Sequence, residues 1–114
     1  MRVLVVGAGR VGSKVLLQLK KNPSIAVFTV DPREEPQAVS EGIIDIVDYR
    51  RELTPRDLEE VVRLVVPDLV LVTTSADDIS RTGVPGLDML VEALRGELEA
   101  TADVPIIAVA RSSV

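Results

Sequence analysis

Three glycines near the start of the chain, Gly7, Gly9 and Gly12, have the spacing Gly-x-Gly-x-x-Gly. They lie between an apolar stretch typical of a buried strand and a stretch with helical periodicity. In this context the first glycine permits a sharp turn, the second lets a pyrophosphate approach the backbone, and the third lets the helix pack closely on the sheet. Free N–H groups at the helix N-terminus favour an anion. The loop therefore predicts a phosphate site, with a tight turn that binds no ligand as the alternative. The residues assigned to it are Gly7, Ala8, Gly9, Arg10, Val11 and Gly12.

An acidic residue, Asp31, ends the next predicted strand, 19 residues after Gly12. A carboxylate at this place accepts hydrogen bonds from the ribose of an adenosine and repels a 2′-phosphate, which favours NAD or NADH over NADP. ATP, ADP and AMP are the alternative ligands. Other interpretations stay open: Asp31 is a solvated turn residue before Pro32, and Arg33 either holds a 2′-phosphate or is solvated. Both Pro32 and Arg33 are assigned to the predicted site.

Strands and helices alternate along the chain, which implies right-handed crossovers and a parallel sheet. The helix that ends before Pro67 has the clearest start, with Thr54 as N-cap, Pro55 at its first position and Asp57 three residues after the cap. A short helix is expected at residues 33–41. The predicted strands cover residues 2–6, 25–30, 43–47, 69–72 and 104–109.

Five such strands with a glycine-rich first turn predict an α/β protein with a three-layer Rossmann fold, in which a doubly wound parallel sheet has the strand order 3-2-1-4-5. We expect residues 1–114 to form this single domain. Its crevice lies at the carboxyl ends of strands one and four. Thr73, Thr74 and Ser75 follow the fourth strand and are therefore assigned to the nucleotide site. Ser75 is also typical of a helix cap, together with Asp78.

The composition narrows the classes of partner. Apolar residues make up 46% of the chain, aromatic residues 2%, and the net charge is −5. The negative charge and the shortage of aromatic side chains argue against a nucleic-acid partner. No apolar run approaches the roughly 20 residues of a membrane helix, and the N-terminus is not signal-like. We therefore expect a cytoplasmic protein without direct membrane insertion.

The sequence suggests no catalytic constellation. It lacks His and Cys, which removes the commonest general base and all thiolate ligands and nucleophiles. Ser75, Asp77 and Asp78 are clustered but have no His or Lys beside them to make a nucleophile–base pair. Asp45 and Asp48 could recruit a divalent ion, although two acids three positions apart are more often solvated. We assign no catalytic residue and no metal site.

The segment Val5–Gly12, Val-Val-Gly-Ala-Gly-Arg-Val-Gly, resembles the opening of the TrkA-N domains, also called RCK or KTN domains. These domains gate or regulate potassium channels and transporters. The resemblance continues at Thr29–Asp31, at Asp68–Thr73 and at Ile107–Arg111, so it covers essentially the whole chain. Only its first element is sharply diagnostic.

The resemblance implies a nucleotide contacted by the glycine loop, with its adenosine ribose on Asp31 and its adenine near Asp48. It also implies a homodimer formed through an apolar face. Val47 departs from the family, which has a Gly-Asp pair at this point, so Asp48 as a plain turn residue is the alternative. A second departure is the break at Gly83–Gly86, where the family has a more continuous helix.

Two functions are compatible with these patterns. The first is a regulatory module in which an adenine nucleotide shifts the domain or its dimer between two states, as the resemblance implies for potassium transport. The second is the cofactor-binding half of an NAD-dependent oxidoreductase whose substrate residues come from elsewhere. We favour the first, although the fold by itself does not decide between them.

Overall fold

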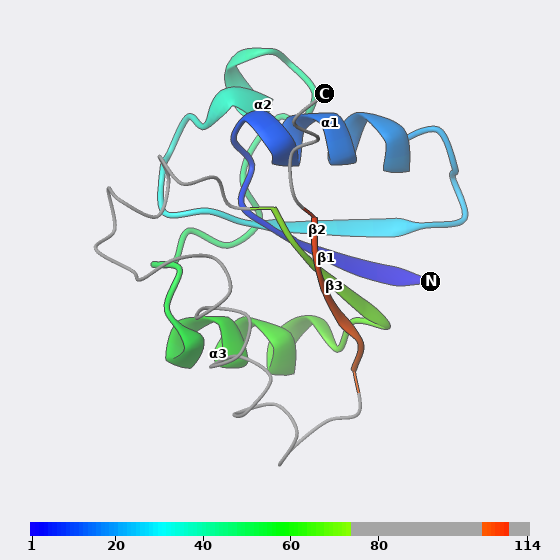
Figure 1. Cartoon of the computed structure of the whole chain (residues 1–114). Coiled ribbons are helices and arrows are strands. Elements are labelled where there is room, and N and C mark those ends of the chain that lie inside the picture. The colour runs from blue at the N-terminus through cyan, green and yellow to red at the C-terminus, as the bar shows by residue number, and fades with distance from the viewer. Residues whose placement is uncertain (74–103, 110–114) are drawn as a thin grey trace.

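The architecture is a parallel β-sheet with helices on both of its faces (Figure 1). The computed structural model describes residues 1–73 and 104–109. The break at Gly83–Gly86 and the capping pair Ser75 and Asp78 lie outside these residues. Within them the sheet order is β2-β1-β3-β4, and every pairing is parallel. The strands are β1 (Arg2–Val6), β2 (Ala26–Val30), β3 (Leu69–Val72) and β4 (Ile106–Ala108).

Strand β1 lies inside the sheet, between β2 and β3. Its residue Val5 is in register with Thr29 of β2 and Leu71 of β3. Because the strands are parallel, their carboxyl ends meet at one edge of the sheet. The glycine loop follows β1, Asp31 follows β2 and Thr73 follows β3. The topology therefore brings these three parts of the predicted site together.

Within residues 1–73 and 104–109, three helices cover the sheet. Figure 1 shows α1 (Arg10–Leu19) and α2 (Gln37–Ser40) on one face and α3 (Pro55–Val65) on the other. The predicted start of α3 is confirmed, because the side-chain oxygen of Thr54 accepts a hydrogen bond from the N–H of Asp57 and a proline stands in the first turn. None of the helices in the described part of the chain is long and apolar enough to span a membrane.

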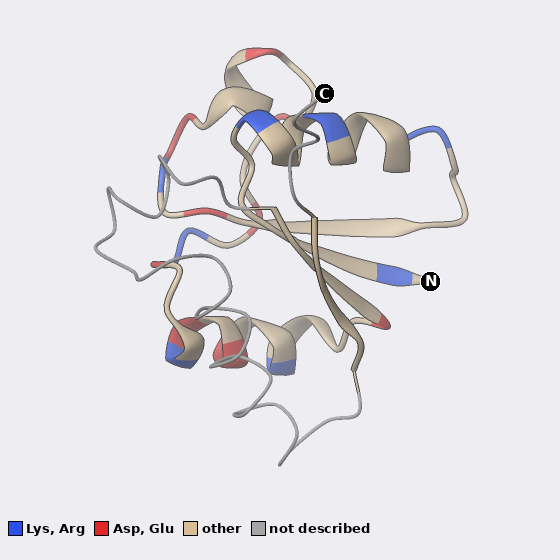
Figure 2. Ribbon diagram, in the orientation of Figure 1, with Lys and Arg blue, Asp and Glu red and all other residues tan. Residues whose placement is uncertain are grey.

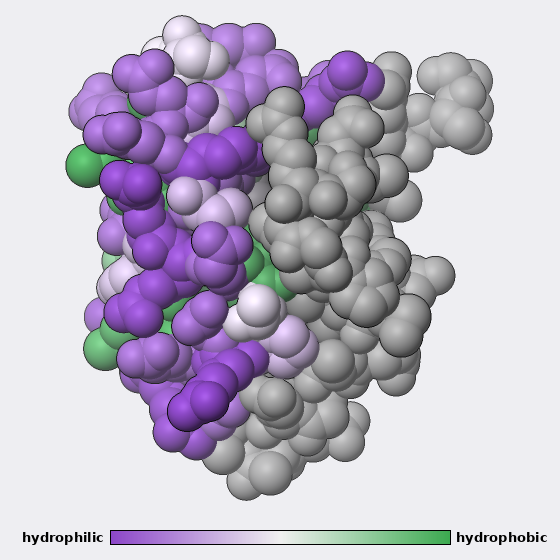
Figure 3. All heavy atoms as spheres, turned by 90° about the vertical axis from the view of Figure 1, so that its left-hand side faces the viewer, coloured by the Kyte–Doolittle hydropathy of each residue, from purple (hydrophilic) through white to green (hydrophobic). Residues whose placement is uncertain are grey.

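The side chains of β1 alternate between two hydrophobic cores. Val3 and Val5 pack in the core beneath α1 and α2, while Leu4 and Val6 pack in the core formed with α3. All four are buried. This arrangement explains the continuous apolar run of β1, because a strand covered on both faces has no solvent side. Charged side chains lie mostly on the helices and loops (Figure 2), and the face in Figure 3 is mainly hydrophilic where it is described.

The prediction of a third strand at residues 43–47 is wrong, and with it the order 3-2-1-4-5. On the edge of β2 that faces away from β1, the described residues form one isolated parallel bridge, between Tyr49 and Val30. One oxygen of the Asp48 carboxylate accepts the N–H of Thr29 at 2.8 Å. The side chain of Asp48 thus binds an N–H group at the edge of β2 that a paired strand would otherwise bind.

Most apolar residues of this segment are partly or fully buried without strand pairing. Ile43 and Ile44 pack against the core beneath α1, and Val47 is buried, whereas Ile46 is exposed. The ammonium group of Lys20 in addition donates to the carbonyl oxygen of Ile43 at 2.6 Å. An apolar run predicts burial, but it does not by itself show whether the backbone pairs with a neighbouring strand.

Candidate functional site

The turn from β1 into α1 depends on a left-handed backbone at Gly7, whose φ is 95°. Residues with a Cβ atom are disfavoured in this region. The N–H of Gly7 donates to the carbonyl oxygen of Val30 at 2.8 Å, which ties the turn to the end of β2. The structure thus gives Gly7 the turning role that the motif predicts.

Close packing explains the glycine at position 12. A Cβ atom on Gly12 would lie 2.2 Å from the carbonyl oxygen of Gly7 and 2.9 Å from Oγ1 of Thr73. The first of these distances is far below van der Waals contact. Because α1 passes so close to the end of β1, only a glycine fits here.

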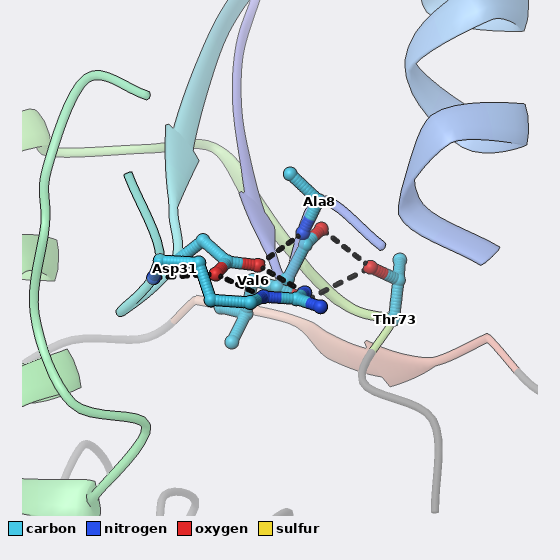
Figure 4. Close-up of polar contacts among 6 residues, drawn as sticks. Val6, Ala8, Asp31 and Thr73 are labelled. Carbon is cyan, nitrogen blue, oxygen red and sulfur yellow. Dashed lines mark hydrogen bonds and ion pairs between the residues drawn. The ribbon is translucent and has the colours of Figure 1, made fainter. Parts of the chain in front are cut away.

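Thr73 holds the loop from the end of β3. Its side chain is buried, and its hydroxyl lies 2.9 Å from the carbonyl oxygen of Val6 and 2.8 Å from that of Gly7 (Figure 4). The hydroxyl has one proton, which the two carbonyl oxygens share. Sequence analysis placed Thr73 in the crevice, and the structure brings it into direct contact with the glycine turn.

The first turn of α1 presents backbone N–H groups that have no acceptor in the part of the chain that the structure describes. Its N-cap, Gly9, has no side chain to accept them, and the first helical bond runs from the N–H of Ser13 to the carbonyl of Gly9 at 2.8 Å. Among the described residues, the N–H groups of Arg10, Val11 and Gly12 have no acceptor. They lie at the end of the helix that carries roughly half a positive charge. Such donors suit the oxygen atoms of a phosphate.

Asp31 connects β2 to the glycine loop. Its side chain is fully buried, and its Oδ2 accepts the backbone N–H of Ala8 at 2.8 Å (Figure 4). On the other side of the loop, the N–H of Ala38 in α2 donates to the carbonyl oxygen of Ala8 at 2.9 Å. Both polar groups of the Ala8 backbone are therefore fixed by the protein.

The side chain of Arg33 forms a two-pronged ion pair with Asp31. Its Nε lies 2.9 Å from Oδ1 and its Nη2 lies 2.8 Å from Oδ2. The backbone N–H of Arg33 donates to Oδ1 as well, at 2.9 Å. Pro32, between the two, is half-buried. The interpretation of Asp31 as a solvated turn residue is wrong, because its carboxylate is 0% exposed.

These contacts determine the pKa of the Asp31 carboxyl. Burial by itself raises this pKa, because it penalises the charged form. The hydrogen bond from the Arg33 side chain, the bonds from the backbone N–H groups of Ala8 and Arg33, and the charge of Arg33 lower it by more. The pKa therefore lies below its ordinary value of 3.8, and Asp31 is charged at neutral pH.

Asp48 forms its hydrogen bonds with Thr29 of β2. It is exposed, and its carboxylate accepts the N–H of Thr29 at 2.8 Å and the hydroxyl of Thr29 at 3.1 Å. The contact of Asp48 with an adenine stays a prediction. Thr74 and Ser75 lie outside the described residues, so the structure does not place them.

Two further features of this site are not evident from the sequence. The contact of Ala38 with Ala8 joins two backbone groups, and no side-chain pattern could have revealed it. The hydroxyl of Ser13 is buried and has no hydrogen-bond partner among the described residues, although buried hydroxyls are usually bonded. Ser13 directly follows the last glycine of the motif, in the first turn of the helix. The sequence therefore indicates that Ser13 lies in the first turn of the helix, but not that its hydroxyl is buried.

The described residues around the loop combine anion-binding backbone donors with one buried carboxylate that can accept hydroxyl groups. No group of three or more acidic side chains within residues 1–73 and 104–109 is arranged to hold a metal ion. The arrangement is therefore suited to binding and orienting a ligand that carries both phosphate and hydroxyl groups.

No protein-family model matches the sequence, and no curated protein is similar to it. Solved structures are similar in fold. A dTDP-glucose 4,6-dehydratase from Bacillus anthracis in complex with NAD has a TM-score of 0.66 at 18% identity, over 95% of this chain. A glycinamide-RNase-transformylase T from Mycobacterium tuberculosis has a TM-score of 0.56 at 21% identity, also over 95%.

This chain spans 36% of the dehydratase and 28% of the transformylase. At such low identities the likeness shows a fold, and this fold is an α/β, Rossmann-like one. The resemblance to TrkA-N domains therefore rests on the sequence motifs alone.

Proposed function

We propose that the chain is a regulatory module that binds NAD, NADH or another adenine nucleotide at the carboxyl edge of its sheet. The observation that carries this proposal is the set of backbone N–H groups of Arg10, Val11 and Gly12, which have no acceptor among the described residues. They stand beside a buried carboxylate, Asp31, whose N–H partner is in the same loop. N–H groups that donate to a phosphate, and a carboxylate that accepts ribose hydroxyls at this separation along the chain, match the recognition of an adenosine phosphate.

In this proposal the residues of the chain bind and orient the ligand. The first turn of α1 holds the pyrophosphate, and Gly9 lets it approach the backbone closely. Asp31 accepts the hydroxyl groups of the adenosine ribose. Thr73 acts indirectly, because it positions the carbonyl groups of the turn. NAD, when bound, supplies a nicotinamide that accepts hydride.

The test is calorimetric titration of the full chain with NAD, NADH, NADPH, ATP, ADP and AMP. The informative variant is Arg10→Asp, because residue 10 is exposed and opens α1. An acidic side chain there suits the helix N-terminus but repels a phosphate bound to the same N–H groups. The matched control is Lys14→Asp, which makes the same change of charge at an exposed position one turn further along the helix.

We expect micromolar binding of at least one of these nucleotides, weakened about tenfold or more by Arg10→Asp and much less by Lys14→Asp. Loss of binding in both variants to the same extent would point to a general effect of net charge and against a site at the helix end. Absence of binding to all six ligands contradicts the proposal.

The finer part of the proposal comes from the resemblance to TrkA-N domains. It holds that the nucleotide shifts a three-layer domain or its homodimer between two states, and that a potassium channel or transporter responds. A ligand can do this only if its affinity for the two states differs. Sedimentation velocity with and without NAD tests the dimer, and a chain that stays monomeric in both conditions contradicts it.

The second candidate function, the cofactor-binding half of an oxidoreductase, is favoured by the likeness of fold to a dehydratase that binds NAD. A site that positions a nicotinamide for hydride transfer must contact it. NAD should then bind more tightly than ADP-ribose, which lacks the nicotinamide ring. Equal affinities for the two ligands contradict this second function and leave the first one standing.

A further inference from the structure

The carboxylate of Asp31 has no acceptor site left for a ligand. A carboxylate offers about four acceptor sites on its two oxygens. Oδ1 accepts the backbone N–H and the Nε–H of Arg33, both at 2.9 Å. Oδ2 accepts the backbone N–H of Ala8 and the Nη2–H of Arg33, both at 2.8 Å. In this state the ribose of a nucleotide finds the predicted acceptor already occupied.

The four bonds fall into two pairs. Two of them come from backbone N–H groups, and these do not depend on the side chain at position 33. The other two come from the guanidinium of Arg33, which fills one site on each oxygen of Asp31. Two neighbouring hydroxyl groups of a ribose would use the same pattern, one donor to each oxygen.

We propose that the guanidinium of Arg33 occupies the place of the adenosine ribose hydroxyls, so that a nucleotide must displace this side chain to reach Asp31. The inference rests on the proposed function and adds a specificity-determining residue to that site. Arg33 thereby lowers the apparent affinity for every ligand that relies on the ribose diol.

The surroundings permit such an exchange. The side chain of Arg33 is 28% exposed, whereas that of Asp31 is 0% exposed, so Arg33 lies on the solvent side of the pair. When its side chain turns away, Asp31 keeps both backbone bonds and remains in place. The two ribose hydroxyls then replace the two lost bonds, and the buried charge stays fully hydrogen-bonded.

The test compares the wild type with Arg33→Ala in titrations with ADP, 2′,3′-dideoxy-ADP, NAD and NADPH. Removing the guanidinium frees one site on each oxygen of Asp31. We expect ADP and NAD to bind about tenfold more tightly, because the fraction of protein that is competent to bind rises. Dideoxy-ADP, which has no diol, should bind equally to both proteins. The control is Arg63→Ala, which removes a positive charge paired with Glu59 on α3.

Each outcome bears on the proposal. If ADP and NAD bind the two proteins equally, nucleotide binding stands and the displacement is overturned. If NADPH binds the wild type best and Arg33→Ala weakens it, Arg33 is a ligand for a 2′-phosphate, which also overturns the displacement. If neither protein binds any of the four ligands, the proposed function fails and the inference fails with it.

A second measurement does not require Arg33→Ala to fold. In the free wild-type protein, the Nε–H of Arg33 donates to Asp31 and should give a slowly exchanging NMR signal. Saturating NAD should return this signal to the position and the exchange rate of a solvated arginine. A signal that stays unchanged while NAD is bound overturns the proposal.

Discussion

The hydroxyl oxygen of Thr73 lies 2.8 Å from the carbonyl oxygen of Gly7, although the two residues are 66 positions apart in the sequence. This contact joins the end of β3 to the turn that starts α1. The same hydroxyl is the side-chain atom nearest to the place where a Cβ on Gly12 would lie. The geometry of the glycine loop therefore depends on a neighbouring strand as well as on the motif itself.

Replacement of Thr73 by valine should reduce stability. Valine has nearly the same shape but no hydroxyl, so the carbonyl of Gly7 loses its donor in a buried place. We expect a loss of about 1–3 kcal/mol in the free energy of unfolding. Thr73→Ser, which keeps the hydroxyl, should lose clearly less. Urea denaturation followed by circular dichroism measures both, and a valine variant as stable as the wild type contradicts the role given to this hydroxyl.

Replacement of Gly12 by alanine should destabilise the fold through a clash. The added Cβ would lie 2.2 Å from the carbonyl oxygen of Gly7, so the backbone of the turn or of α1 must move. Overpacking of this kind costs about 1–3 kcal/mol and sometimes more.

The matched control for this clash is Gly42→Ala. Gly42 has a φ of +75° but no atom within 4 Å of an added Cβ. This substitution should show only left-handed backbone strain, about 1–2 kcal/mol, and Gly42→Asn should recover part of it. Equal losses for Gly12→Ala and Gly42→Asn would argue against a clash at Gly12.

Much of the fold could be predicted from the sequence because two local signals were strong. The continuous apolar run of β1 reports a strand covered on both faces, and the start of α3 carries the cap residue Thr54. The prediction of the third strand failed because most of its apolar residues pack against the core through their side chains, without strand pairing. At the edge of β2 the carboxylate of Asp48 accepts the N–H of Thr29, a contact that the apolar pattern of the segment does not reveal.

The site was predicted less completely than the fold. The motif correctly indicated that Gly7 forms the turn and that Gly12 permits close packing, because both roles depend on backbone geometry. The state of Asp31 could not be predicted, because it depends on the conformation that Arg33 adopts two residues later. Sequence order shows that an arginine is near, but not that its guanidinium covers the carboxylate.

The pKa of Asp31 predicts a specific dependence of stability on pH. Burial raises this pKa. The hydrogen bonds and the charge of Arg33, together with the hydrogen bond from the N–H of Ala8, lower it by a larger amount, so it lies below 3.8. A group with a lowered pKa in the folded state stabilises the protein above its unfolded pKa, and this contribution is lost as the pH falls through the folded pKa.

The corresponding variant is Asp31→Asn, compared with the wild type by urea denaturation at several pH values. The difference in unfolding free energy should be constant between about pH 5 and 7 and should shrink below about pH 4. Asp45→Asn, at an exposed position, controls for the change of net charge. A difference that is the same at pH 3 and pH 7 contradicts a lowered pKa.

The C-terminal end of α3 should become more stable when its C-cap residue, Val66, is changed. Val66 has a φ of 51° and a ψ of 59°, the left-handed conformation that β-branched residues avoid, and its side chain is 65% exposed. Its N–H donates to the carbonyl oxygen of Val62 at 2.8 Å, so the helix ends in a left-handed capping motif in which glycine is the commonest residue. Val66→Gly should therefore raise the free energy of unfolding by about 1 kcal/mol, since it removes strain and little packing.

Leu64→Gly, at an exposed position inside the same helix, should instead lower the free energy of unfolding by about 1 kcal/mol. Opposite signs in urea denaturation would establish that the backbone at Val66 is strained, whereas a loss in both variants would show that the exposed valine contributes more by packing than its conformation costs.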